Sequence, residues 1–220
     1  GFNNFDTINF LESWITSISF TLQIYFDFSG YIDMATGSAL LFNILLPKNF
    51  DSPLKSTSLI NFWKSWHITL FKFLMNYLYF PILRSLQKIN FLNAMIVTLI
   101  VFFISGVWHG PTYGYIIFGT LHGIGIIINH IFNKITTVKL SNFFGWLLTL
   151  LYVNFTFIFF RCENLESAIV IIKNMVGFNG FEINTNYFES YLLIIVYIIS
   201  ISISMFFKNV NYLIENFYKK

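Results

Sequence analysis

Long apolar runs constrain this chain more than any other feature. Residues 91–104 and 113–131 are almost wholly apolar and flank the short stretch 105–111. With its flanking residues, each run reaches the roughly 20 residues that a helix needs to cross a bilayer. Charged residues make up 10% of the sequence and hydrophobic residues 56%, whereas soluble domains carry roughly 25% charged residues. The sequence therefore predicts an all-α, polytopic membrane helix bundle.

Further spans are expected at residues 14–47, 142–160 and 190–207. Residues 47–90 are aromatic, amphipathic and interrupted by charges, which favours an interfacial or re-entrant helical segment over a span. A short amphipathic helix is expected at 164–178 within a loop covering 161–189. We expect a single membrane domain over residues 1–220.

The charges predict an orientation. Residues 47–90 contain one acidic residue, Asp51, and six basic residues: Lys48, Lys55, Lys64, Lys72, Arg84 and Lys88. By the positive-inside rule this segment, the loop at 133–140 and the Lys219–Lys220 tail are cytoplasmic. The acidic 161–189 loop and the N-terminal end are then extracytoplasmic. A multi-pass protein of the inner (cytoplasmic) membrane, in contact with lipid, is expected. The net charge of +3 does not indicate a nucleic-acid partner.

His109 is the leading candidate for a functional residue. An imidazole at membrane depth is costly and marks a functional site by default. Gly106 and Gly110 allow close approach of other groups, and Pro111 ends or kinks the helix just after the histidine. Trp108 beside it can pack or lie at an interface. The alternative is a histidine that only joins helices by hydrogen bonds.

Other polar residues in apolar surroundings are secondary candidates. In the 14–47 span, Ser29 and Asp33 share one helical face, while Asp27 lies about 120° away; interhelical hydrogen bonding is the alternative role. His67 follows Trp63 and Trp66 and, taken alone, fits an interfacial histidine.

The chemistry open to His109 is general-base catalysis, since an ordinary histidine pKa of about 6.5 leaves it neutral near pH 7. No acid occurs between Asp51 and Glu163, so a Ser-His-Asp triad is hard to build. His122 can neighbour His109 across the turn, but the histidines lack metal-site spacing. The single Cys162 excludes an internal disulfide. No metal or bound cofactor is expected. The many Phe side chains suit either core packing or an acyl-chain tunnel.

Three ordered stretches resemble a known family. Residues 25–37 (YFDFSGYIDMATG) resemble its Y-x-D-F-S-G-Y-x-D-M-A-x-G segment. Residues 62–70 (FWKSWHITL) and 77–81 (YLYFP) resemble F-W-x-x-W-H-x-S/T-L and Y-x-Y-x-P. Residues 105–110 (SGVWHG) and 118–123 (FGTLHG) resemble G-x-W-H-G and W-G-x-x-H-G. Over about residues 20–178 the chain is similar to membrane-bound O-acyltransferases, in their bacterial branch of alginate and peptidoglycan O-acetyltransferases and teichoic acid D-alanyl transferases.

The resemblance implies that His109 is catalytic and that His67 is a second signature histidine on the donor side. It implies a tunnel joining a cytoplasmic thioester donor, acetyl-CoA or an acyl-carrier thioester, to an extracytoplasmic acceptor. That acceptor would be a polysaccharide or a partner acetyltransferase. Family members have further N-terminal helices, so we expect this chain to be the C-terminal part of a longer acyltransferase. The family's usual Arg-Asp pair is replaced by Met75-Asn76, and Pro111 and Phe118 also depart from its pattern.

Other functions stay open from the sequence. D-alanyl transfer from a carrier protein to teichoic acid is an alternative within the same class. A transporter could use Asp27, Asp33, His67 and His109 as a proton path. A structural membrane subunit would need these histidines only for assembly.

Overall fold

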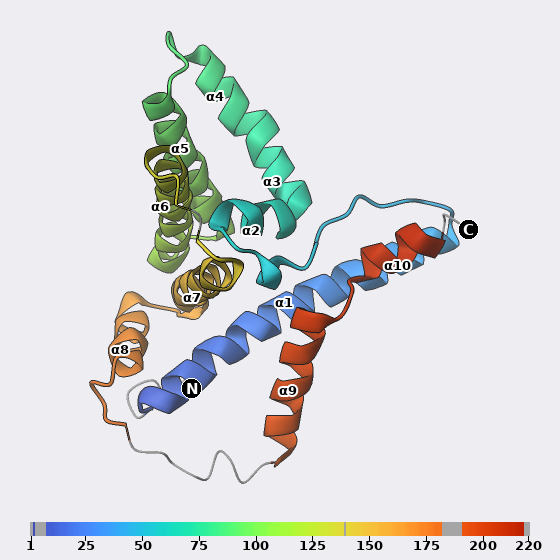
Figure 1. Cartoon of the computed structure of the whole chain (residues 1–220), viewed down its shortest axis with the longest axis vertical. Helices are drawn as coiled ribbons and strands as arrows, with labels where there is room; N and C mark the ends of the chain where they lie inside the picture. The colour runs from blue at the N-terminus through green and yellow to red at the C-terminus, as the bar shows by residue number, and fades with distance from the viewer. Residues whose placement is uncertain (1, 3–7, 139, 182–190, 218–220) are drawn as a thin grey trace.

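The chain folds into helices joined by turns, with no β-strand among the residues described. A computed structural model describes all residues except 1, 3–7, 139, 182–190 and 218–220 (Figure 1). Some of the charged residues used to predict the orientation lie outside the described residues: Asp6, Lys139, Glu182, Glu189, Lys219 and Lys220. The helices are α1 Phe10–Leu41, η1 Pro53–Lys55, α2 Leu59–Ser65, α3 Ile68–Leu74, η2 Met75–Tyr79, α4 Phe80–Ser85, α5 Phe91–His109, α6 Tyr113–Ile135, α7 Asn142–Arg161, α8 Leu165–Met175, α9 Tyr191–Phe206 and α10 Val210–Phe217. The predicted all-α fold is confirmed.

Three helices of the described chain are long and apolar enough to cross a membrane. They are α5, α6 and α7, with 19, 23 and 20 residues and mean hydropathies of 2.2, 1.5 and 1.8. Their bounds agree with the spans expected at 91–109, 113–132 and 142–160. Side-chain caps fix two of their starts: Asn90 accepts from the Asn93 amide, and Ser141 from the Phe144 amide, which pairs otherwise orphan donors.

Glycines bring α5 and α6 into close contact. Gly106 of α5 faces Gly119 of α6, and a Cβ at Gly119 would meet the Phe102 carbonyl and lie 2.8 Å from the Gly106 Cα. Small residues at a crossing let membrane helices pack backbone to backbone. The turn between the two helices follows Gly110, which ends α5 with φ of +153°, a conformation that residues with a side chain rarely adopt.

Helix α2 enters the bundle along α6. At its start the Leu59 amide donates to Asn129 Oδ1 at 2.8 Å, and one turn later Trp63 Nε1 donates to His122 Nδ1 at 3.1 Å. Asn129 and His122 are about 10 Å apart along α6, at about 1.5 Å per residue. Helix α2 therefore descends from the end of α6 toward its middle.

The chain reverses at His67, whose φ and ψ of 44° and 54° are left-handed. Beyond it α3, η2 and α4 run back out beside α5 (Figure 1). They are held there by an apolar cluster consisting of Leu74, Leu83, Val97 and Val101. Segment 59–85 is called the hairpin below, with His67 at its tip; its interfacial or re-entrant placement in a membrane stays a prediction.

Hydrogen bonds join distant segments at both ends of the bundle, and the side of the membrane that each end faces stays a prediction. At one end, Trp14 Nε1 of α1 donates to the Met175 carbonyl of α8 at 3.0 Å. At the other, Lys55 Nζ donates to the Phe207 carbonyl after α9 at 2.8 Å, and Asn209 Nδ2 to Asp51 Oδ1 at 2.7 Å. The segments assigned to one side of the membrane therefore lie together.

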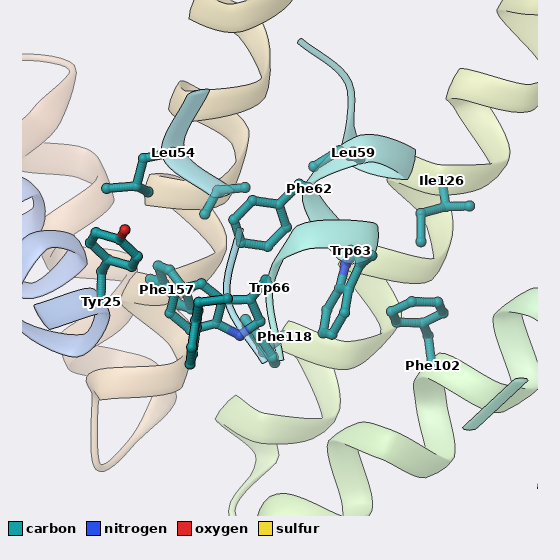
Figure 2. Packing of buried hydrophobic residues seen from close by; sticks show 12 residues of the cluster. Tyr25, Leu54, Leu59, Phe62, Trp63, Trp66, Phe102, Phe118, Ile126 and Phe157 are labelled. Atoms are coloured by element: carbon teal, nitrogen blue, oxygen red, sulfur yellow. The ribbon is translucent and has the colours of Figure 1, made fainter. Parts of the chain in front are cut away.

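An aromatic core joins the hairpin to the long helices. Figure 2 shows side chains of α1, α2, α5, α6 and α7 gathered in one cluster. Phe62 stacks on Trp66 with ring centroids 5.6 Å apart, and Phe118 stacks on Phe157 at 5.7 Å. These aromatic residues, candidates for either packing or a tunnel lining, pack here against one another; the tunnel stays a prediction.

Candidate active site

His109 is the last residue of α5 and lies among aromatic rings. Its imidazole is half-buried, with ring centroids 5.1 Å from Phe160, 6.0 Å from Phe118 and 6.1 Å from Tyr115. Within the described part of the chain the ring makes no hydrogen bond. Both nitrogens are therefore available to a ligand, which is what a general base requires.

His67 is held by an amide from the segment before η1. Asn49 Oδ1 lies 3.1 Å from His67 Nδ1 and accepts from the Thr69 amide at 3.1 Å and the Thr69 hydroxyl at 2.9 Å. A backbone amide can only donate, so the Asn49 atom that faces it must be the oxygen. His67 Nδ1 then carries the hydrogen, and Nε2 is left with a lone pair.

The two histidines come together although they belong to separate segments. Burial lowers the pKa of His67 most, and the nearby His109 imidazolium lowers it further, to about 4. His67 is therefore neutral at pH 7, with its Nε2 able to accept a hydrogen bond. Phe28 of α1 packs edge-on against it at 4.9 Å. The hairpin tip and the end of α5 thus form one candidate site.

The tryptophans of the two motifs occupy different environments. Trp63 and Trp66 are buried in the aromatic core, 2% and 6% exposed. Trp108 is 64% exposed, although its ring lies 5.0 Å from that of His109. Only Trp108 is thus open to an outside partner.

The polar residues of α1 differ in their surroundings. Ser29 and Asp33 line a cavity of about 180 Å³ together with Lys208, whereas Asp27 is exposed. The separation of Asp27 from Asp33 follows the predicted helical geometry.

His122, expected as a possible neighbour of His109, is fully buried and hydrogen-bonded. Its ring lies 4.6 Å from Phe118, which also contacts His109. Trp63 donates to its Nδ1, and its Nε2 lies 2.9 Å from Thr156 Oγ1. His122 therefore touches the same ring as His109 but has no exposed surface.

Several residues of the site carry no signal that sequence reasoning used. Asn49 and Thr69 fix His67, Phe160 and Tyr115 flank His109, and Thr156 pairs with His122. Thr69 fills the S/T position of the F-W-x-x-W-H-x-S/T-L segment, which is the one available hint. The other contacts join segments far apart in sequence.

The replaced Arg-Asp pair lies in a π-helical turn. Met75 and Asn76 open η2, and Met75 lines a cavity of about 200 Å³ with Lys64 and His130. π-helical turns are rare and frequently found at functional sites.

The fold and site define a helical membrane protein with one histidine, His67, at the turn of hairpin 59–85 and a second, His109, at the end of the apolar helix α5. A sequence profile of the membrane-bound O-acyltransferase family matches residues 3–169, and the chain belongs to this family. This confirms the resemblance drawn from the three motifs.

Three relatives are named for acyl transfer to peptidoglycan, alginate or teichoic acid. The chain is 43% identical over 185 residues to a peptidoglycan O-acetyltransferase of Helicobacter pylori, covering 82% of this chain and 34% of that protein. It is 33% identical over 175 residues to a probable alginate O-acetylase AlgI of Pseudomonas aeruginosa (79% and 33%). A teichoic acid D-alanyltransferase of Bacillus subtilis is 30% identical over 120 residues (52% and 30%). The chain spans about a third of the length of these relatives.

Proposed function

We propose that this chain carries the acyl-transfer site of a multi-pass O-acyltransferase of the inner membrane. The enzyme moves an acyl group, acetyl in the first instance, from a cytoplasmic thioester to a hydroxyl. That hydroxyl belongs to a cell-envelope polysaccharide or to a partner transferase. Family membership and the names of the relatives support the class of reaction.

The observation that carries the proposal is that His67 and His109, which come from separate segments, lie near enough for a charge on His109 to affect His67. The charge of one affects the other, while the first enters on the hairpin and the second ends a membrane helix. His109 has no hydrogen-bond partner among the described residues, and His67 has a fixed tautomer with a free Nε2. One imidazole is thus open to a proton and the other is set to accept a hydrogen bond.

The reaction needs one base and no further cofactor chemistry. His109 removes the proton of the acceptor hydroxyl as its oxygen attacks the thioester carbonyl. The carbon–oxygen bond forms, the carbon–sulfur bond breaks, and the thiolate leaves with the proton held by His109. His67 Nε2 orients a donor or acceptor group by a hydrogen bond. Acetyl-CoA or an acyl-carrier thioester supplies the acyl group.

The basic side of the chain suits the donor. Hairpin 59–85 enters from the segment rich in Lys and Arg, which the positive-inside rule assigns to the cytoplasm. A phosphate-bearing thioester would meet Lys64 there, at the edge of the cavity with His130.

D-alanyl transfer is the second candidate. It is favoured by the 30% identity to a teichoic acid D-alanyltransferase over half of this chain. The reaction at His109 would be the same, with D-alanine in place of acetyl.

The test is the acyl content of the envelope in cells that make the protein as wild type, His109→Ala or Trp146→Phe. Trp146→Phe is the control because Trp146 lies on α7, where its Nε1 donates to the Leu54 carbonyl, and has no role in the proposed reaction. Base-released acetate and D-alanine are both measured at equal protein levels.

Loss of acetate in His109→Ala alone supports the proposal, and loss of D-alanine alone favours the second candidate. If wild type and His109→Ala release the same amounts of both, the chain does not carry acyl transfer through His109.

A further inference from the structure

His122 has a hydrogen-bond pattern that permits one tautomer. Trp63 Nε1 can only donate, so His122 Nδ1 must accept this bond of 3.1 Å. His122 Nε2 therefore carries the hydrogen and donates to Thr156 Oγ1 at 2.9 Å. The Thr156 hydroxyl in turn donates to the Val153 carbonyl at 2.8 Å. Every polar atom in this chain of contacts is paired.

This network ties together three elements that build the candidate site. Trp63 belongs to α2, His122 to α6 and Thr156 to α7. All three side chains are buried, and the exposed fractions of His122 and Thr156 are 0%. A substrate cannot touch His122, so its effect on the reaction must pass through its neighbours.

Two routes lead from His122 to the reacting histidines. Phe118 packs against His122 with ring centroids 4.6 Å apart and against His109 at 6.0 Å. Trp63 lies one turn of α2 before the tip that presents His67, and Figure 2 shows it beside Phe62 and Phe102 in the core. His122 thus contacts a neighbour of each histidine.

We propose that His122 is a positioning residue that sets the hairpin tip with His67 against the end of α5 with His109. This inference rests on the proposed function, since it concerns the geometry of that site. A displacement of about 1 Å at a reacting group can cost about a hundredfold in rate. A fixed tautomer with both nitrogens paired admits one placement of Trp63 relative to Thr156.

The experiment uses membrane vesicles with the protein as cells make it and measures transfer of radiolabelled acetyl from acetyl-CoA. The variants are Thr156→Val, which removes the acceptor of His122 Nε2, and Thr156→Ser, which keeps a hydroxyl. Trp63→Phe removes the other bond. Trp146→Phe is the matched control, because Trp146 Nε1 donates to the Leu54 carbonyl instead. Rates are expressed per folded protein, and kcat and KM for acetyl-CoA are separated.

We expect Thr156→Val and Trp63→Phe each to lower kcat about 10-fold, from small misplacements of the reacting groups, with KM changed less than twofold. Thr156→Ser restores most of the rate, and Trp146→Phe stays at the wild-type rate. Unchanged kcat per folded protein in both variants would mean that the network serves folding alone and would overturn the inference. A raised KM with normal kcat would also overturn it, since His122 would then act on donor binding.

Wild type and His109→Ala, measured in the same vesicles, separate the two failures. If His109→Ala transfers as much acetyl as wild type, the proposed function fails. If wild type transfers neither acetyl from acetyl-CoA nor D-alanine from its carrier thioester, the proposed function fails as well. If wild type is active, His109→Ala is inactive and Thr156→Val keeps the wild-type kcat, only the positioning role fails.

Discussion

His109 and His122 contact the same phenylalanine but have opposite environments. Both precede a glycine in the sequence, and both contact Phe118. His122 is fully buried with both nitrogens paired, whereas His109 is half-buried and makes no hydrogen bond within the described residues. The imidazole of His122 therefore joins helices by hydrogen bonds, whereas the imidazole of His109 remains available to a substrate.

The comparison separates two kinds of cost. Removing a paired buried side chain leaves its partners without hydrogen bonds and costs stability. Removing an unpaired side chain costs little stability but removes whatever it does to a substrate. Stability and activity should therefore respond in opposite order at the two histidines.

The largest stability effect is expected for His122→Ala. It leaves Trp63 Nε1 and one side of Thr156 unpaired and opens a cavity, which costs about 2–5 kcal/mol. His109→Ala should stay within about 1 kcal/mol of wild type, because no hydrogen bond to a described residue is lost. The midpoint of thermal unfolding in detergent measures both. Equal destabilisation of the two variants would contradict the expected difference between a hydrogen-bonded His122 and an unpaired His109.

A pH effect is expected from His67. Its pKa in the folded protein is about 4, below the ordinary value of about 6.5, so the folded state disfavours the imidazolium. The contribution of His67 to the free energy of unfolding is then fully present above pH 6.5 and is lost as the pH falls from 6.5 toward 4. Substituting His67→Gln should flatten this part of the curve of unfolding midpoint against pH. An unchanged slope in the variant would show that other groups cause it.

A smaller activity effect is expected for Thr69→Ala. The Thr69 hydroxyl donates to Asn49 Oδ1 at 2.9 Å, and its loss loosens the amide that fixes His67. One hydrogen bond is worth about 0.5–1.5 kcal/mol, so the rate should fall about 2- to 10-fold. Thr69→Ser keeps the hydroxyl and should retain the rate. If the alanine variant reacts at the wild-type rate, the hydrogen bond between Thr69 and Asn49 does not contribute to the reaction.

The smallest effect is expected for Trp108→Phe. Trp108 neighbours His109 but is 64% exposed, and the aromatic contact survives the substitution. Exposed substitutions usually change stability by less than about 0.5 kcal/mol, and acyl transfer should stay within about twofold. A larger loss of transfer with normal stability would indicate that Trp108 contacts a substrate.

The sequence was most informative where chemistry follows the chain locally. Apolar length alone placed α5, α6 and α7, and the mixture of charges and aromatic residues set segment 47–90 apart from the spans. The separation of Asp27 from Asp33 followed from the helical period. Each of these predictions uses neighbours in sequence, and such patterns are fixed by helix geometry.

The remaining features depend on contacts between segments far apart. Nothing in the local pattern states that Asn49 holds His67, or that Trp63 and Thr156 take both nitrogens of His122. From the local pattern His67 fits an interfacial histidine and His109 an imidazole at membrane depth. The descent of α2 along α6 brings them together. His109 and His122 are each followed by a glycine, and their different hydrogen bonding follows from the residues that pack against them.

The most direct test compares His109→Gln with His122→Asn for acetyl transfer per folded protein in membrane vesicles. The asparagine can still accept a hydrogen bond from Trp63, whereas the glutamine cannot act as a base. We expect His109→Gln to lose about 100-fold or more, the usual contribution of a general base, and His122→Asn to lose about 10-fold or less. Equal losses, or near-normal transfer by His109→Gln, would contradict the assignment of the chemistry to His109.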